Sequence, residues 1–274
     1  MGKITRKEFL AEGVVLLEIE ARRVAENAQA GQFVVLMPFE TSERIPISLH
    51  NWDNEKGTIE IVFQVVGRTT TELASLEAGD EPYALLGPLG KPMEIRGYGN
   101  VVCVGGGLGI PPIYNLAREL KRAGNNVVSI IGARTSSLLI LEERIKSVSD
   151  RLLICTDDGS YGEKGFVTDV LKKLIEKERI DLVIAIGPVP MMEAVANLTY
   201  NPKIKTIVSL NPLMLDATGM CGVCRVKVGG ETKFACVDGP KFDAHQVDFQ
   251  DLKRRLAMYK KEEEKALEQW KARI

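Results

Sequence analysis

The sequence has few of the residues on which several common kinds of protein depend. It contains two histidines in 274 residues, so hydrolytic chemistry based on a histidine triad is a weak expectation. No run of apolar residues reaches the roughly 20 needed to cross a bilayer, and no membrane span is expected. Lys and Arg number 36 against 37 Asp and Glu, a balance that gives no basic surface for nucleic acid.

The first residues also lack the features of a secretion signal. M-G-K-I-T-R-K-E-F-L has basic residues but no apolar core of about 7–15 residues and no small-residue cleavage site. We therefore expect a cytoplasmic protein, in which thiols stay reduced. Clustered cysteines in such a protein bind metal more often than they form disulfides.

Residues 1–98 are predicted to form a small antiparallel β-barrel. Short apolar stretches such as T-I-E-I-V-F-Q alternate here with turn residues, which is the pattern of closely spaced strands. One short helix is expected where Thr69 to Thr71 can supply an N-cap. A glycine-rich turn, R-G-Y-G-N, ends the barrel.

Residues 99–210 change to a repeat of apolar strand, loop and helix, which predicts βαβ units and a parallel sheet. Unbroken apolar strands such as V-V-C-V agree, because a parallel sheet is covered on both faces. The expected fold is a Rossmann-like domain. Its ligands would bind at the C-terminal ends of the strands.

The first strand of this domain leads into G-G-G-L-G-I-P-P, residues 105–112, which opens a helix. Gly105 and Gly107 match the start of the dinucleotide-binding pattern G-x-G-x-x-G, whereas Ile110 replaces its third glycine. Free amides at the start of the helix can hold a pyrophosphate. The alternative is a tight turn without a ligand.

Loops after the other strands would line the same crevice. Arg134 ends the second strand and, taken alone, favours a 2′-phosphate and hence NADP. An aspartate at the start of a loop such as T-D-D-G is as often a cap as a ligand contact. The residues of the predicted nucleotide site are Gly106, Gly107, Gly109, Ile110, Pro111, Arg134, Thr135, Asp157, Asp158, Gly187, Pro188 and Met191.

Three of the five cysteines lie in a C-terminal module expected over residues 211–248. Gly229-Gly230 fits a type I′ hairpin, and pairing of Val228 with Glu231 would return Cys236 to the neighbouring cysteines. Counting back from Cys221 by the plant-type spacing C-x4-C-x2-C reaches an aspartate, an acceptable ligand for iron. The predicted ligands of a 2Fe-2S cluster are Asp216, Cys221, Cys224 and Cys236.

Other readings of this segment stay open. The same cysteines could hold a structural zinc, as in a nucleotide-binding sensor without turnover, or Cys224 and Cys236 could form a disulfide with Cys221 free. Cys103 and Cys155 are expected to be small core residues. Residues 249–274 predict a charged helix that lies against its own domain or docks on a partner.

Together these motifs resemble the ferredoxin–NADP reductase superfamily of flavoproteins, in which an FAD-binding barrel precedes a nicotinamide domain. E-R-I-P-I-S-L is similar to the superfamily motif R-P-I-S with the arginine displaced by one residue, and V-F-Q-V-V-G-R-T-T matches its next flavin stretch. The resemblance implies FAD contacts from Arg44, Pro46, Ile47, Ser48, Phe63, Gln64, Val65, Gly67, Thr69 and Thr70. No residue is assigned as an acid, base or nucleophile.

The cysteine segment narrows the resemblance to two families. One comprises the electron-transfer subunits of dihydroorotate dehydrogenase B, which typically have four cysteines there. D-A-T-G-M-C-G-V-C is more similar to the small subunits of NADH-dependent reduced ferredoxin:NADP oxidoreductase, aspartate included. That resemblance implies NAD(H) rather than NADP(H), and a larger partner like the glutamate synthase small subunit, with FAD and 4Fe-4S clusters. It also implies electron bifurcation, with ferredoxin reached through the complex.

Overall fold

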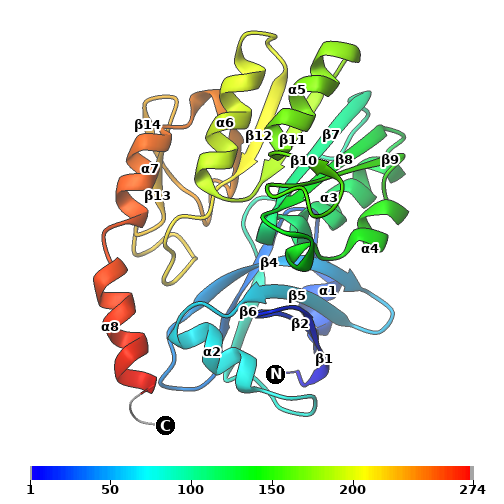
Figure 1. The fold of residues 1–274 in the computed structure, drawn as a ribbon. Coiled ribbons are helices and arrows are strands. Elements are labelled where there is room, and N and C mark those ends of the chain that lie inside the picture. Colours follow the sequence, from blue (N-terminus) through cyan, green and yellow to red (C-terminus); the bar gives the residue numbers. More distant parts are fainter. Residues whose placement is uncertain (1, 272–274) are drawn as a thin grey trace.

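The computed structural model describes residues 2–271, and its N-terminal part is a curled antiparallel sheet in the order β1-β2-β5-β4-β3-β6 (Figure 1). Leu17, Leu36 and Ile61 are fully buried inside the curl. The predicted barrel is thereby confirmed. Its elements are β1 (Ile4–Ala11), β2 (Val14–Glu20), α1 (Arg22–Asn27), β3 (Phe33–Met37), β4 (Ile45–Asp53), β5 (Thr58–Gln64), α2 (Arg68–Ser75) and β6 (Ala84–Leu89).

The helix expected near Thr69 is α2, and its cap differs in detail from the prediction. Gly67 occupies the N-cap position, and its amide donates to the hydroxyl of Thr70 at 2.9 Å. Glycine has no side chain to accept a bond, so the threonine at the third helical position reaches back instead. The helix α1 was not predicted, because its six residues carry no capping side chain.

A seven-stranded sheet forms the second layer, in the order β10-β9-β8-β7-β11-β12-β15. All its neighbours are parallel except β15, which pairs antiparallel with β12. This is the predicted Rossmann-like domain. Its strands are β7 (Asn100–Gly106), β8 (Asn126–Ala133), β9 (Arg151–Thr156), β10 (Glu163–Lys164), β11 (Leu182–Ile186), β12 (Lys205–Ser209) and β15 (Lys241–Asp243).

Helices cover both faces of this sheet, as its apolar strands predicted. The helices α3 (Ile110–Arg122) and α4 (Glu142–Ser147) pack on one face, and α5 (Val167–Lys177) and α6 (Val189–Tyr200) pack on the other. The helix α3 also contacts β4 of the barrel. Strand order reverses between β7 and β11, and such a switch point is where ligands bind in open α/β sheets.

The C-terminal part contains the predicted hairpin, β13 (Arg225–Val228) and β14 (Glu231–Phe234), with Val228 opposite Glu231. The predicted register is therefore confirmed. Residues 241–243 were assigned to the cysteine module and form β15, a strand that was not predicted, at the edge of the nucleotide-domain sheet. The boundaries 1–98, 99–210, 211–248 and 249–274 stay a prediction.

The expected C-terminal helix is broken in two. The structure has α7 (Phe249–Leu256) and α8 (Lys260–Lys271) with a turn between them, and residues 272–274 of the expected helix lie outside the described part. α7 lies against the nucleotide domain, whereas α8 extends to α2 of the barrel (Figure 1). No helix within residues 2–271 is both long and apolar enough to cross a membrane.

Gly109 packs so closely against the end of β11 that we expect no other residue to fit. A Cβ atom built there would lie 1.8 Å from the carbonyl oxygen of Ile186, which is backbone and cannot rotate away. Gly109→Ala should therefore lower the free energy of unfolding by about 1–3 kcal/mol, the usual cost of overpacking. Urea unfolding followed by circular dichroism measures this cost.

The matched control is Gly97→Ala, because a Cβ atom at Gly97 meets no atom within 4 Å. This change should stay within about 0.5 kcal/mol of the native protein. Equal stability of the two variants would contradict the close packing of Gly109.

Candidate functional site

A cavity of about 1090 Å³ lies between the barrel and the nucleotide domain. The start of β4, the end of β5, the glycine loop before α3 and the C-terminal ends of β8 and β11 all contribute to its wall. Sites for one small molecule usually measure about 300–1000 Å³. The cavity therefore lies at the upper end of this range and has room for a large ligand.

Six of the ten expected flavin contacts line this cavity. The barrel residues in the wall are Pro46, Ile47, Ser48, Phe63, Gln64 and Thr70. Val65, Gly67 and Thr69 do not reach it, and Thr69 is buried. Arg44 lines a second cavity of about 380 Å³ that it shares with Asp216, which agrees with its displacement in the motif.

Eight of the twelve expected nucleotide contacts line the large cavity from the opposite side. They are Gly106, Gly107, Gly109, Arg134, Asp157, Gly187, Pro188 and Met191. Ile110 is fully buried behind the loop, and Pro112 rather than Pro111 reaches the cavity. Pro112 follows Gly109 by three residues, so the two lie on the same side of the helix start.

Thr135 and Asp158 do not line the cavity but hold their loops in shape. The hydroxyl of Thr135 lies 2.9 Å from that of Ser137, and Asp158 accepts bonds from the amide and hydroxyl of Ser160 at 2.9 and 2.7 Å. These bonds lower the pKa of Asp158. Asp158 is thus a turn-capping residue, the alternative that the sequence pattern left open.

Sequence reasoning missed two parts of the wall. Phe166 borders the cavity with 60% of its surface exposed, so its ring is available for stacking on a nucleotide base. An aromatic residue directly after Gly165, at the start of a helix, was the available signal. The segment after β12, including Leu210, Asn211 and Met214, lines the cavity and leads to the cysteine module.

The four predicted cluster ligands come together as two pairs. The thiol of Cys221 lies 2.9 Å from Oδ1 of Asp216, and the sulfurs of Cys224 and Cys236 are 3.1 Å apart. All five cysteines are free, so the structure does not contain the alternative disulfide. Cys224 and Cys236 are buried, whereas Cys221 is exposed.

The loop around Asp216 holds its carboxylate in a fixed orientation. Oδ2 of Asp216 accepts bonds from the amides of Met220 and Cys221 at 3.0 and 3.3 Å and from the Thr218 hydroxyl at 3.0 Å. The Cys221 thiol and these donors lower the pKa of Asp216 to about 2, so it is a carboxylate. Ala217 adopts a left-handed φ of 58°, which turns the loop sharply.

Within residues 2–271 no three histidine, cysteine or carboxylate side chains gather around one point, so the Cys221 sulfur does not join those of Cys224 and Cys236. In a 2Fe-2S cluster each iron takes two protein ligands, and two pairs are what these residues form.

Comparisons with known proteins agree with this description. The family described as "Iron-sulfur cluster binding domain of dihydroorotate dehydrogenase B" matches residues 211–248, and "Oxidoreductase NAD-binding domain" matches residues 103–197. The chain is 44% identical over 270 residues to the dihydroorotate dehydrogenase B (NAD(+)) electron transfer subunit homolog of Thermotoga maritima, covering 98% of this chain and 95% of that protein.

More distant relatives carry the same name. Identity to the dihydroorotate dehydrogenase B (NAD(+)) electron transfer subunit of Bacillus caldolyticus is 35%, over 89% of this chain and 96% of that protein. Among solved structures, a chain of NADH-dependent reduced ferredoxin-NADP oxidoreductase superposes with a TM-score of 0.94 at 44% identity, covering 98% of both chains. Phthalate dioxygenase reductase, at 18% identity and a TM-score of 0.59, shares the fold alone, over 83% of this chain and 85% of that one.

These findings confirm an oxidoreductase with a ferredoxin-reductase-like fold. The expected cofactors are supported as well. The iron–sulfur domain supports a 2Fe-2S cluster, the NAD-binding domain supports NAD(H), and the ferredoxin-reductase-like fold supports FAD. The resemblance found from the sequence motifs is confirmed as well. The chain belongs to the family of dihydroorotate dehydrogenase B electron-transfer subunits and their homologues, which includes a subunit of NADH-dependent reduced ferredoxin-NADP oxidoreductase.

Proposed function

We propose that this chain is the electron-transfer subunit of a larger flavoenzyme, in which NAD(H) exchanges hydride with FAD and electrons pass through the 2Fe-2S cluster to a partner. The observation that carries this proposal is the single cavity lined by both the flavin motif and the glycine loop. When bound, the flavin converts between two-electron hydride chemistry and the one-electron chemistry of an iron–sulfur centre. The chain's own residues hold and align these groups.

Each wall of the cavity has a distinct part in this function. Ser48 and Gln64 on the barrel side would bind the flavin ring, and the loop Gly106–Gly109 would bind the nucleotide diphosphate. Met191 and Pro188 border the space between them on the nucleotide side. Since the lining is mostly apolar, bound ligands would exclude water from the reacting faces.

The cysteine module is proposed to hold the cluster with one residue pair for each iron. Asp216 and Cys221 would bind the outer iron, and Cys224 and Cys236 the inner one, because the second pair is buried. Residues 210–214 line the cavity and directly precede the proposed cluster ligands in the sequence. They therefore provide a short covalent link between the flavin side and the cluster.

Exposed apolar residues around the outer pair suggest where a partner binds. Met220 is 89% exposed, and Leu215 and Leu86 are each 48% exposed. Apolar side chains at such exposure favour burial by another protein. We infer a larger subunit with FAD and 4Fe-4S clusters, related to the glutamate synthase small subunit, with ferredoxin as a substrate of the complex.

A second candidate is the electron-transfer subunit of dihydroorotate dehydrogenase B, a name that several relatives carry. Asp216 at the first ligand position and the TM-score of 0.94 to the ferredoxin-NADP oxidoreductase chain favour the bifurcating enzyme. Copurification with dihydroorotate dehydrogenase would favour the second candidate. A cytoplasmic location stays a prediction from the sequence.

Iron analysis and EPR test the cluster directly. Protein purified without oxygen should contain about two irons per chain and give a reduced-cluster signal after dithionite treatment. Asp216→Ala should lose iron or shift this signal, whereas Asp216→Cys should retain both irons with altered g values, since thiolate also binds iron.

The control for the cluster test is Glu231→Ala on the neighbouring hairpin, where the carboxylate pairs with Lys233. It should leave the iron content and the spectrum unchanged. One zinc per chain without an EPR signal would overturn the electron-transfer function and support a nucleotide-binding sensor.

The nucleotide preference is expected to be for NAD(H), although Arg134 lines the cavity. NADH should therefore reduce the flavin with at least a tenfold higher kcat/KM than NADPH, and Arg134→Ala should weaken both without reversing the preference. Stopped-flow absorbance under anaerobic conditions measures both rates. A native preference for NADPH would assign Arg134 to a 2′-phosphate.

The proposed partner surface is tested with Met220→Glu in the complex with the larger subunit. Burying a new charge should weaken association at least about tenfold, measured by biolayer interferometry. Phe9→Glu, at the opposite edge of the barrel sheet and 68% exposed, is the control and should bind normally. Equal loss in both variants would argue against a surface centred on Met220.

A further inference from the structure

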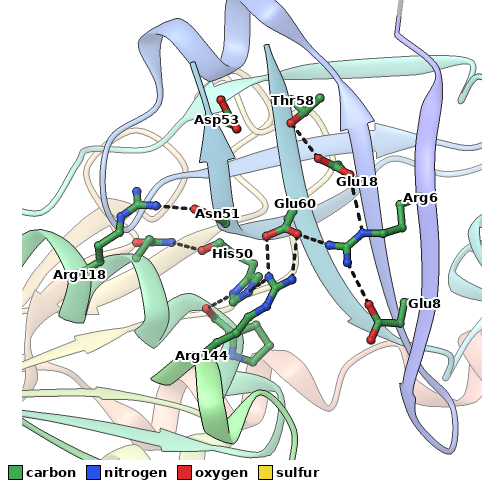
Figure 2. Close-up of polar contacts among 12 residues, drawn as sticks. Arg6, Glu8, Glu18, His50, Asn51, Asp53, Thr58, Glu60, Arg118 and Arg144 are labelled. Atoms are coloured by element: carbon green, nitrogen blue, oxygen red, sulfur yellow. Dashed lines mark hydrogen bonds and ion pairs between the residues drawn. The ribbon is translucent and has the colours of Figure 1, made fainter. Parts of the chain in front are cut away.

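His50 occupies an irregular position in β4. Leu49 pairs with Ile61 and Asn51 pairs with Glu60, so His50 is the extra residue of a β-bulge. A bulge redirects a side chain that regular pleating would place elsewhere. The His50 side chain is fully buried and lies at the contact between the barrel and the nucleotide domain, as Figure 2 shows.

The two ring nitrogens of His50 contact two elements of the nucleotide domain. Nδ1 lies 2.8 Å from the carbonyl oxygen of Pro111 in the first turn of α3, and Nε2 lies 3.1 Å from Nη1 of Arg144 on α4. A carbonyl only accepts and a guanidinium only donates, so Nδ1 carries the hydrogen and Nε2 accepts. Burial lowers the pKa of His50 to about 4, which keeps the ring neutral near pH 7.

Arg144 is held in place by Glu60 of β5. Its Nη1 and Nη2 donate to Oε2 and Oε1 of Glu60 at 2.7 and 3.2 Å, and Arg6 of β1 approaches the same carboxylate from the other side (Figure 2). Burial opposes ionisation of Glu60, but the bonds and charge of Arg144 outweigh it and lower the pKa of Glu60. A charged pair therefore fixes the donor that contacts His50.

The helix α3 is bonded to the same stretch of β4. Nδ2 of Asn115 donates to the carbonyl oxygens of Leu49 and His50 at 2.6 and 3.3 Å, and the Arg118 guanidinium lies 4.5 Å from the Trp52 ring centroid. Ser48, two residues before His50, lines the flavin side of the cavity. Hydrogen bonds from His50 and Asn115 thus connect β4, which carries Ser48, to the first half of α3, which follows the glycine loop.

We propose that His50 is a positioning residue, which fixes the glycine loop relative to Ser48 and thereby sets the nicotinamide against the flavin. It acts as the Nδ1-protonated ring, which Arg144 and Glu60 hold in place. The inference rests on the proposed function, because it assigns an alignment role within that same cavity. His50 contacts neither ligand space directly and acts through the carbonyl of Pro111. A displacement of about 1 Å at reacting atoms can slow a reaction about a hundredfold.

Three substitutions separate the two bonds of His50. His50→Asn can keep a donor near the Nδ1 position for Pro111, His50→Gln can keep an acceptor near the Nε2 position for Arg144, and His50→Leu has neither. His245→Asn is the matched control, since the second histidine bonds Thr199 at 3.0 Å and lies outside the cavity wall. Arg144→Lys keeps the positive charge beside Glu60 but cannot bond both Glu60 and His50. This variant replaces His50→Leu in the test if His50→Leu does not fold.

The readouts are flavin reduction by saturating NADH in single turnover, long-wavelength charge-transfer absorbance of the NADH complex, and hydrogen exchange of residues 105–113 without nucleotide. His50→Leu and His50→Gln should slow reduction about 10–100-fold, lower the charge-transfer absorbance and speed exchange in that segment. His50→Asn, which keeps the donor for Pro111 but loses the acceptor for Arg144, should restore only part of each signal, and Arg144→Lys should show a similar partial loss. The control should match the native protein, with FAD content and the cluster spectrum unchanged in all variants.

A loss of thermal stability alone, with native reduction rate, absorbance and exchange, would overturn the positioning role and leave His50 as a packing residue. The positioning role is also overturned if Arg144→Lys behaves as the native protein. Failure of the proposed function looks different, because the native protein itself would then lack iron or resist reduction by NADH.

Discussion

The contact between β4 and α3 buries polar side chains, and each of these must find a hydrogen-bond partner there. The arrangement of the cavity between the two domains depends on these hydrogen bonds. His50 and Asn115 are fully inaccessible, yet each side chain finds partners on the opposite domain. Unpaired, such groups would cost about 1–3 kcal/mol each. The observed placement of the two domains meets all of these requirements together, and it creates the cavity between them.

The cavity and the cysteine module differ in how they control access. Apolar residues dominate the cavity, so a bound flavin would be removed from water, whereas Cys221 of the proposed outer ligand pair is exposed at the surface. The inner pair lies in the apolar core that also includes Phe33 and Val208. The two proposed ligand pairs therefore differ in burial, and the pair that contains Cys221 is the one that a partner protein could reach.

The sequence predicted the features that depend on local chemistry. The Gly229-Gly230 turn determined the hairpin register, and the glycine loop lies at a strand end because βαβ geometry demands it. Features that depend on distant residues were not predictable. Phe166 and Leu210 become wall residues only when loops from several strands converge, and the bulge at His50 is defined by the pairing of β4 with β5.

The three-residue strand β15 has a consequence for solubility. It covers the outer edge of β12, which would otherwise present unpaired amides and carbonyls to other chains. This cover follows Cys236 by five residues, so its position depends on the same folded segment that carries the cluster ligands. Unfolding of the cysteine module would therefore also uncover the edge of β12, where the strand of another chain could pair.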